Sequence, residues 1–189
     1  MNIKLQSILM ENSKIAAVKN EIDLEKALLS STKIIFILSS NICSIEEMTR
    51  KVKAQNKICF IHLDMVQGLN SKENSALTFL KENTFADGII TTKSQVARTA
   101  KKIGFLVILR CFLIDSISLN TTLKHLSETN YIDAMEILPG VIPKIIKKIT
   151  MESSIPVIAG GLICDEEDVE IALNSGAMAV STTKLNLIN

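Results

Sequence analysis

Eight short apolar runs, spread along the whole chain, restrict its fold more than any other feature of the sequence. They read KIAAV from Lys14, IIFIL from Ile34, ICFIHLD from Ile58, DGIITT from Asp87, FLVILRCF from Phe105, YIDAMEILPG from Tyr131, IPVIAGG from Ile155 and AMAVSTT from Ala177. Stretches with helical spacing lie between most of them, such as SIEEMTRKVKAQ over 44–55 and CDEEDVEIALNSG over 164–176. Nearly continuous apolar strands that alternate with helices are typical of a parallel sheet whose helices pack on the outside.

Eight such units predict an α/β fold, a small (β/α)8 TIM-like barrel with short loops, formed as a single domain over residues 1–189. The chain falls below the usual length for this fold, so its loops must be short. The alternative is an open doubly wound sheet. The count of eight runs and the absence of a G-x-G-x-x-G fingerprint favour the barrel.

The composition excludes few functions, but it indicates the cellular compartment of the protein. The net charge of +1 gives no overall basic field, so nucleic-acid binding would need a local patch. Cys43, Cys59, Cys111 and Cys164 are too far apart for a zinc or dithiol motif. Three of them lie in or next to apolar runs, so we expect buried thiols in a reducing cytoplasm. No apolar stretch approaches the roughly 18 residues of a membrane helix. We therefore expect a soluble cytoplasmic protein with no membrane partner, no metal site and no cofactor.

Charged residues gather where the predicted strands end, which is where ligands bind in barrels of this type. In ICFIHLD one side of the strand is wholly apolar and should face the helices, so His62 and Asp64 should point inside. The same alternation sends Arg110 and Glu136 inward, and Lys19 follows the first run. The mouth of the barrel is therefore predicted to collect two acidic groups, two basic groups and a histidine.

Glycines and hydroxyls end the last two runs. Bare backbone N–H groups and short hydroxyl side chains after strands seven and eight of a barrel commonly hold a phosphate. The candidates are Gly160, Gly161, Ser181, Thr182 and Thr183. The plainer alternatives stay open: the glycines could only form a tight turn, the charges could only form an ion-pair network, and His62 could be a satisfied interior histidine.

The blocks FIHLDMVQGL (60–69), DGIITTK (87–93), RCFLID (110–115), EILPGVIPKII (136–146) and IPVIAGGLICDEEDVEIALNSGAMAVSTT (155–183) appear in order over almost the whole chain. In these blocks the sequence resembles the bacterial glycerol uptake operon antiterminator family. The resemblance implies a barrel that binds the leader mRNA of glycerol-utilisation genes and prevents premature termination when its effector, glycerol 3-phosphate, is present.

The resemblance also implies roles for the mouth residues. Gly160, Gly161, Ser181 and Thr182 would hold the phosphate, Lys19 or Arg110 would add positive charge, and His62, Asp64 or Glu136 would accept protons from the ligand's hydroxyls. Family members often have arginine where this chain has Lys19, so a two-pronged contact with the anion would become a point-charge contact.

Two basic triplets with i, i+3, i+4 spacing lie on predicted helices and are candidates for RNA contact: Arg98, Lys101 and Lys102, then Lys144, Lys147 and Lys148. Arg50, Lys51 and Lys53 form a third cluster. Cations near helix C-termini are favoured by the helix dipole whatever the function, and few aromatic residues are available to stack on bases. RNA binding therefore rests on the resemblance.

Two other functions compete with a non-enzymatic regulator. An enzyme acting on a small phosphorylated polyol or sugar could use His62, Asp64 or Glu136 for proton transfer. The second competing function is that of a binding or structural protein that has lost its ligand. Short loops leave little for a lid that excludes water, and the resemblance favours the regulator. The sequence leaves the oligomeric state open, with a homo-oligomer among the alternatives.

Overall fold

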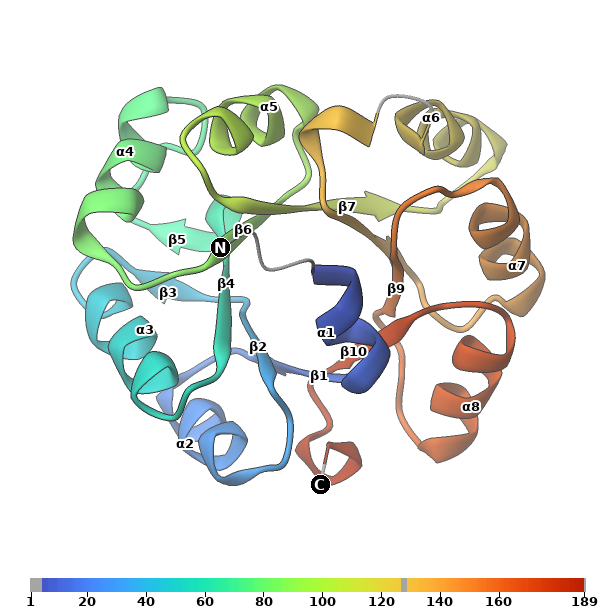
Figure 1. The fold of residues 1–189 in the computed structure, drawn as a ribbon, viewed down its shortest axis with the longest axis horizontal. Helices are drawn as coiled ribbons and strands as arrows, with labels where there is room; N and C mark the ends of the chain where they lie inside the picture. The colour runs from blue at the N-terminus through green and yellow to red at the C-terminus, as the bar shows by residue number, and fades with distance from the viewer. Residues whose placement is uncertain (1–4, 127–128, 189) are drawn as a thin grey trace.

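Eight parallel strands close into a barrel in the computed structural model, which describes residues 5–126 and 129–188 (Figure 1). The strands follow one another around the barrel in the order β1-β10-β9-β8-β7-β6-β4-β2. Their bounds are β1 (Lys14–Val18), β2 (Ile34–Ile37), β4 (Ile58–His62), β6 (Gly88–Thr91), β7 (Leu106–Phe112), β8 (Ala134–Leu138), β9 (Val157–Gly160) and β10 (Ala179–Thr182). Each apolar run of the sequence supplies one of them, so the predicted TIM-like barrel is confirmed.

Helices cover the outside of the barrel, one after each strand except the last. They are α2 (Glu21–Leu29), α3 (Ile45–Ala54), α4 (Asn74–Asn83), α5 (Ser94–Lys102), α6 (Ser116–Leu126), α7 (Pro143–Glu152) and α8 (Glu166–Asn174). Among the residues that the structure describes, β10 is followed by the short 3₁₀ turn η3 (Leu185–Leu187). Across the described ranges, every helix is too short or too polar to span a lipid bilayer.

A further helix, α1 (Leu5–Glu11), closes one end of the barrel. Figure 1 shows it in the middle of the ring of strands. Its buried side chains Leu5 and Leu9 cluster with interior residues such as Ile15 and Ile34, which lie near the starts of β1 and β2. Because α1 fills the amino end, a ligand reaches the interior from the carboxyl end of the strands.

Side chains alternate between the inside of the barrel and the helices. On β4, Cys59 and Ile61 belong to the large cluster that packs under the helices, whereas Phe60 belongs to the interior cluster. On β7, Val107 and Leu109 face the helices and Ile108 faces inside. The inward and outward directions that the sequence predicts for these residues are therefore confirmed.

Four smaller elements lie near the ends of the barrel strands. The 3₁₀ turn η1 (Leu63–Met65) follows β4 directly, and β5 (Val66–Gln67) then pairs with β3 (Ser40–Asn41) in a separate two-stranded sheet. A third turn, η2 (Thr129–Tyr131), precedes β8. None of these four elements was predicted from the sequence, and η1 ends the strand register of β4 just before Asp64.

Candidate functional site

A cavity of about 360 Å³ opens at the carboxyl end of the barrel. Its walls come from the ends of β1, β7, β8 and β10 and from the loop between β9 and α8. The charged and hydroxyl side chains on these walls are Lys19, Arg110, Glu136, Ser181, Thr182, Thr183 and Lys184. The structure therefore brings most of the predicted mouth residues to one small cavity.

A chain of hydrogen bonds crosses the floor of this cavity. The Nε of Arg110 donates to Glu136 Oε2 at 2.6 Å, and the Oγ of Ser181 donates to Glu136 Oε1 at 2.5 Å. The Glu136 side chain is only 1% exposed and that of Arg110 10%. Both carboxylate oxygens are thus engaged in a buried ion pair, which is stable only because each charge is hydrogen-bonded.

Gly160 makes room for this chain. A Cβ at Gly160 would lie 2.5 Å from Ser181 Oγ and 2.7 Å from Glu136 Oε1, closer than nonbonded atoms approach. The position needs glycine because the carboxylate and the hydroxyl meet directly over its backbone. The first of the two predicted phosphate glycines therefore lies under the floor of the cavity.

The second glycine starts an unusual turn on the cavity wall. Gly161 has φ of +74° and Leu162 has φ of +62°, and the Leu162 side chain is 68% exposed. Left-handed backbone at a leucine is uncommon and costs free energy, and such strain is frequent at binding sites. Neighbouring loops hold the turn: Gly140 N donates to Gly161 O at 3.0 Å, and Thr182 Oγ1 donates to the carbonyl of Ile163 at 2.9 Å.

Several backbone N–H groups on the cavity wall have no hydrogen-bond acceptor among residues 5–126 and 129–188. Those of Leu162, Ile163 and Thr183 are among them. The exposed amines of Lys19 and Lys184 form no ion pair within the same ranges. Free amides and amines on one wall are the usual partners of a bound anion.

His62 lies inside the barrel but does not line the cavity. It is 4% exposed, and its Nδ1 has no hydrogen-bond partner within the described part of the chain. Burial, helped by the nearby positive charge of Arg110, lowers the pKa of His62 to about 4. The imidazole is therefore neutral at neutral pH and has an unused polar atom.

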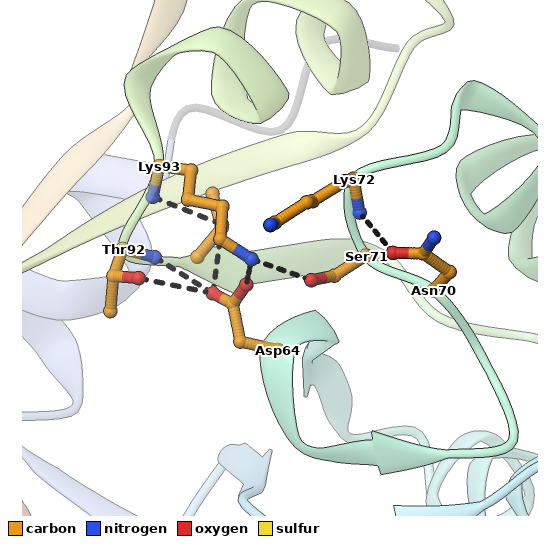
Figure 2. A network of polar contacts seen from close by, with 7 residues as sticks. Asp64, Asn70, Ser71, Lys72, Thr92 and Lys93 are labelled. Atoms are coloured by element: carbon orange, nitrogen blue, oxygen red, sulfur yellow. Dashed lines mark hydrogen bonds and ion pairs between the residues drawn. The ribbon is translucent and has the colours of Figure 1, made fainter.

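Asp64 forms a separate network on the other side of the mouth, which Figure 2 shows from close by. Its carboxylate accepts hydrogen bonds from Lys93 Nζ at 2.6 Å, the Thr92 amide at 2.9 Å and Thr91 Oγ1 at 3.0 Å. Lys93 Nζ also donates to Ser71 Oγ at 2.6 Å. Burial opposes ionisation of Asp64, but these donors outweigh it and lower the pKa of the carboxyl to about 2.

This network joins η1, the end of β6 and the loop before α4, and none of its residues lines the cavity. Sequence reasoning did not assign a role to Lys93 or Ser71. The only signal was the block DGIITTK, which ends with a lysine directly after a strand. The ligand contact predicted for Asp64 stays a prediction, and in the structure its carboxylate binds this lysine.

The cysteines differ from expectation in part. Cys59 is buried as predicted, and Cys111 is half-buried. The expectation is wrong for Cys43 and Cys164, which are exposed, and Cys164 lies on the cavity wall. Both lie in loops that follow strand ends, outside the apolar runs on which the expected burial was based. Within the described ranges, His, Cys, Asp and Glu side chains do not gather in groups of three or more that could hold a metal ion.

The three basic clusters differ in their pairing. In the α3 cluster, Arg50 pairs with Glu47, Lys51 with Glu25 at 2.6 Å and Lys53 with Asp87 at 2.8 Å. In the α5 cluster, Lys101 pairs with Asp133 at 2.5 Å and the Arg98 guanidinium lies 3.9 Å from the centre of the Tyr131 ring. The α7 lysines are exposed and form no ion pair with any described residue: Lys144, Lys147 and Lys148.

Known proteins are similar to this chain over nearly its whole length. A family model described as glycerol-3-phosphate responsive antiterminator matches residues 14–188. A protein of Escherichia coli, the uncharacterized protein YgcP, is 43% identical over 179 residues, which cover 95% of this chain and 93% of that protein.

Two solved structures are similar over nearly the whole chain. The glycerol uptake operon antiterminator regulatory protein of Listeria monocytogenes is 35% identical with a TM-score of 0.85, covering 91% of this chain and 92% of that one. A glycerol uptake operon antiterminator-related protein of Thermotoga maritima is 31% identical with a TM-score of 0.81, covering 93% of this chain and 97% of that one. The similarity extends over almost the full length of each.

Proposed function

The chain belongs to the family of glycerol-3-phosphate responsive antiterminators, and from this we propose that it is a cytoplasmic regulator with two ligands. One is glycerol 3-phosphate, bound as effector in the cavity at the barrel mouth. The other is the leader mRNA of glycerol-utilisation genes, whose transcription it would allow to continue. The observation that supports this most is the set of unpaired amides and amines on the cavity wall.

The phosphate of the effector would lie against the amides of Leu162, Ile163 and Thr183. A phosphate dianion accepts several hydrogen bonds at once and is favoured by nearby positive charge, which Lys19 and Lys184 supply. The cavity volume of about 360 Å³ is at the small end of ligand sites, which suits a three-carbon phosphate.

The residues predicted as phosphate contacts take different parts in this proposal. Gly161 sets the turn that presents the amides, whereas Gly160 leaves space for the buried carboxylate. The hydroxyls of Ser181 and Thr182 already donate to Glu136 and to the Ile163 carbonyl, so they shape the site. In this proposal the amine of Lys19 contacts the phosphate directly, as the sequence predicted.

The glycerol end of the effector would meet the floor of the cavity. Arg110 has guanidinium N–H groups beyond the Nε that binds Glu136, and both residues line the cavity. A guanidinium and a carboxylate can together satisfy two hydroxyl groups as acceptors and donors. His62 has an unused Nδ1 inside the barrel and is a polar partner for a ligand or water that reaches deeper. Asp64 would act indirectly, because its bonds to Lys93 and Thr92 hold the loops at the carboxyl end of the barrel in place.

An enzyme that transfers protons at this mouth is the alternative, and the contacts of the acidic groups speak against it. Both oxygens of Glu136 are hydrogen-bonded inside the floor, and Asp64 is held by Lys93 with a pKa of about 2. A general base works best when its pKa lies near the working pH. Prolonged incubation with glycerol 3-phosphate should therefore leave the compound unchanged. A product that disappears in Glu136→Gln would instead establish the enzyme.

The effector assignment is tested by thermal unfolding with ligands. Glycerol 3-phosphate should raise the melting temperature and glycerol should not, because the phosphate makes most of the proposed contacts. At 100 times its dissociation constant a ligand adds about 2.7 kcal/mol of stability. Inorganic phosphate should give a smaller shift. Equal shifts from glycerol and glycerol 3-phosphate, or no shift from either, would remove the assignment.

A further inference from the structure

The outer helices of the barrel carry their charges unevenly, although the whole chain has a net charge of only +1. Three neighbouring helices, α5, α6 and α7, together hold seven lysine and arginine side chains and one carboxylate, that of Glu152. The seven cations are Arg98, Lys101, Lys102, Lys124, Lys144, Lys147 and Lys148. We call this surface the basic half.

The opposite distribution is found on α8 and α2, which we call the acidic half. These two helices hold seven carboxylates and one lysine, Lys26. The carboxylates are Glu21, Asp23, Glu25, Glu166, Glu167, Asp168 and Glu170. Figure 1 shows α5, α6 and α7 following one another around the ring, and α8 and α2 on either side of η3. The molecule is therefore electrically polar across its width.

We infer that the basic half binds the sugar–phosphate backbone of a base-paired stem in the leader RNA. This inference rests on the proposed function for the existence of an RNA partner, and the structure adds the surface and the kind of RNA. Nucleic-acid affinity comes mainly from lysine and arginine contacts with phosphates. The acidic half repels the same backbone, so the RNA has one favoured side of the barrel.

The lysines of α7 form the centre of this surface. Lys144, Lys147 and Lys148 are exposed, share one face of the helix and form no ion pair with a described residue. Lys102 at the end of α5 is also exposed and unpaired in the described ranges. Lys101 differs, because its amine binds Asp133 and so stabilises the packing of α5 on the barrel.

The basic half differs from the α3 cluster in how many of its cations form ion pairs with carboxylates. Arg50, Lys51 and Lys53 on α3 are each neutralised by a carboxylate, so a phosphate would have to displace an existing partner. The α7 lysines lose no protein contact when they bind an anion. A basic triplet in the sequence is thus a phosphate site only where the fold leaves it unpaired.

The kind of RNA follows from what the basic half lacks. The sequences of α5, α6 and α7 contain no Phe, Tyr or Trp, and Tyr131 beside α5 is only 3% exposed. Proteins that read unpaired bases stack them on exposed aromatic rings, whereas proteins that bind double-stranded RNA contact its phosphates and 2′-hydroxyls by shape. Adjacent packed helices lie about 10 Å apart, so three helices span several phosphates of a stem.

The experiment compares two triple variants that remove the same charge. The test variant is Lys144→Gln, Lys147→Gln and Lys148→Gln on α7. The control is Lys26→Gln, Lys33→Gln and Lys72→Gln, three exposed lysines that are unpaired in the described ranges and lie outside the basic half. Binding of the transcribed leader of a glycerol-utilisation operon is measured at several salt concentrations, with the ligand-induced thermal shift as a check of folding.

The test variant should bind the leader at least roughly tenfold more weakly than the wild type. The slope of its log affinity against log salt concentration should be less negative by about two. The control should match the wild type. A perfectly paired RNA stem should compete for binding, and an unpaired oligouridine should not. Equal leader affinity in the test variant and the control, or competition by oligouridine alone, would overturn the assignment of the surface.

Two further outcomes show whether RNA or a second copy of the chain occupies the basic half. If the wild type does not bind the leader at all, the proposed function fails together with the surface. If the α7 variant binds RNA normally but dissociates a salt-sensitive oligomer in sedimentation runs, the basic half docks on the acidic half of a second copy, and the RNA assignment is wrong.

Discussion

The two sides of the barrel mouth contain similar charged groups but use them differently. On the side of β7, β8 and β10, Arg110 and Glu136 form a buried pair beneath a cavity whose wall has unpaired amides. On the side of β4 and β6, Asp64 and Lys93 form a network that also binds Ser71 and lies outside the lining of this cavity. One side is open to a ligand, and the other is closed by its own contacts.

The difference shows that charge at a strand end does not by itself identify a ligand contact. Asp64 has hydrogen-bond donors from Lys93 and Thr92, so a ligand would have to replace bonds that already exist. The amides of Leu162 and Ile163 have no acceptor within the described ranges, so an anion gains bonds there without displacing a partner. We expect the open side to control ligand binding and the closed side to control the stability of the rim.

The largest effect is expected for Glu136→Gln on the open side. The substitution keeps the shape of the side chain but leaves the guanidinium of Arg110 buried without a counter-charge. Breaking a buried pair in this way costs about 3–5 kcal/mol. Urea unfolding of the variant and the wild type measures the loss. A change below about 1 kcal/mol would mean that water already reaches the pair.

The next effect is a loss of stability in acid that depends on His62. The folded state holds the imidazole neutral with a pKa of about 4, whereas the unfolded chain binds a proton below about 6.5. Stability is therefore full above pH 6.5 and falls as the pH drops toward 4, by about 3 kcal/mol in total. The measurement is urea unfolding across this range. The profile of His62→Gln should be flatter, and equal profiles would contradict the account.

Removal of the charge on the closed side should have a smaller effect. Asp64→Asn weakens the contact with Lys93 and should cost about 1–2 kcal/mol of stability. Because the pKa of Asp64 is about 2, this contribution is present above pH 4 and is lost as the pH falls toward 2. The thermal shift with glycerol 3-phosphate should stay unchanged. A lost shift in a folded variant would show that the closed side also binds the ligand.

The smallest effect is expected for Lys19→Arg on the open side. A guanidinium can make two parallel hydrogen bonds with a phosphate, whereas the amine of Lys19 acts as a point charge. A gain of about 1 kcal/mol corresponds to roughly fivefold tighter binding of glycerol 3-phosphate. Isothermal titration of both proteins measures the ratio. Weaker binding by the arginine variant would show that the cavity fits the shorter reach of lysine.

The sequence predicted the barrel because each strand is a separate apolar run. It also predicted the inward direction of Arg110 and Glu136, since both lie within strands whose alternation continues to their positions. Asp64 lies beyond the strand, in η1, so its position depends on this turn as well as on the alternation. Leu63, the first residue of η1, still packs under the helices as the alternation predicts.

Other features lay beyond sequence reasoning for physical reasons. The wall amides are backbone groups, and a left-handed leucine at position 162 is not suggested by the residue type. The seven residues of α1 have no acidic or basic helix-end signal, so their role in closing the barrel was not evident. The pairing of Lys101 with Asp133 joins positions 32 apart in sequence and depends on the packed fold.

A crystal structure of the protein with glycerol 3-phosphate tests the central claim most directly. The account predicts the phosphate within about 2.7–3.2 Å of the amide nitrogens of Leu162, Ile163 and Thr183, with the Lys19 amine beside it and the Asp64–Lys93 contact intact. A phosphate bound to Lys93, with its bond to Asp64 broken, would contradict the division of the mouth into an open and a closed side.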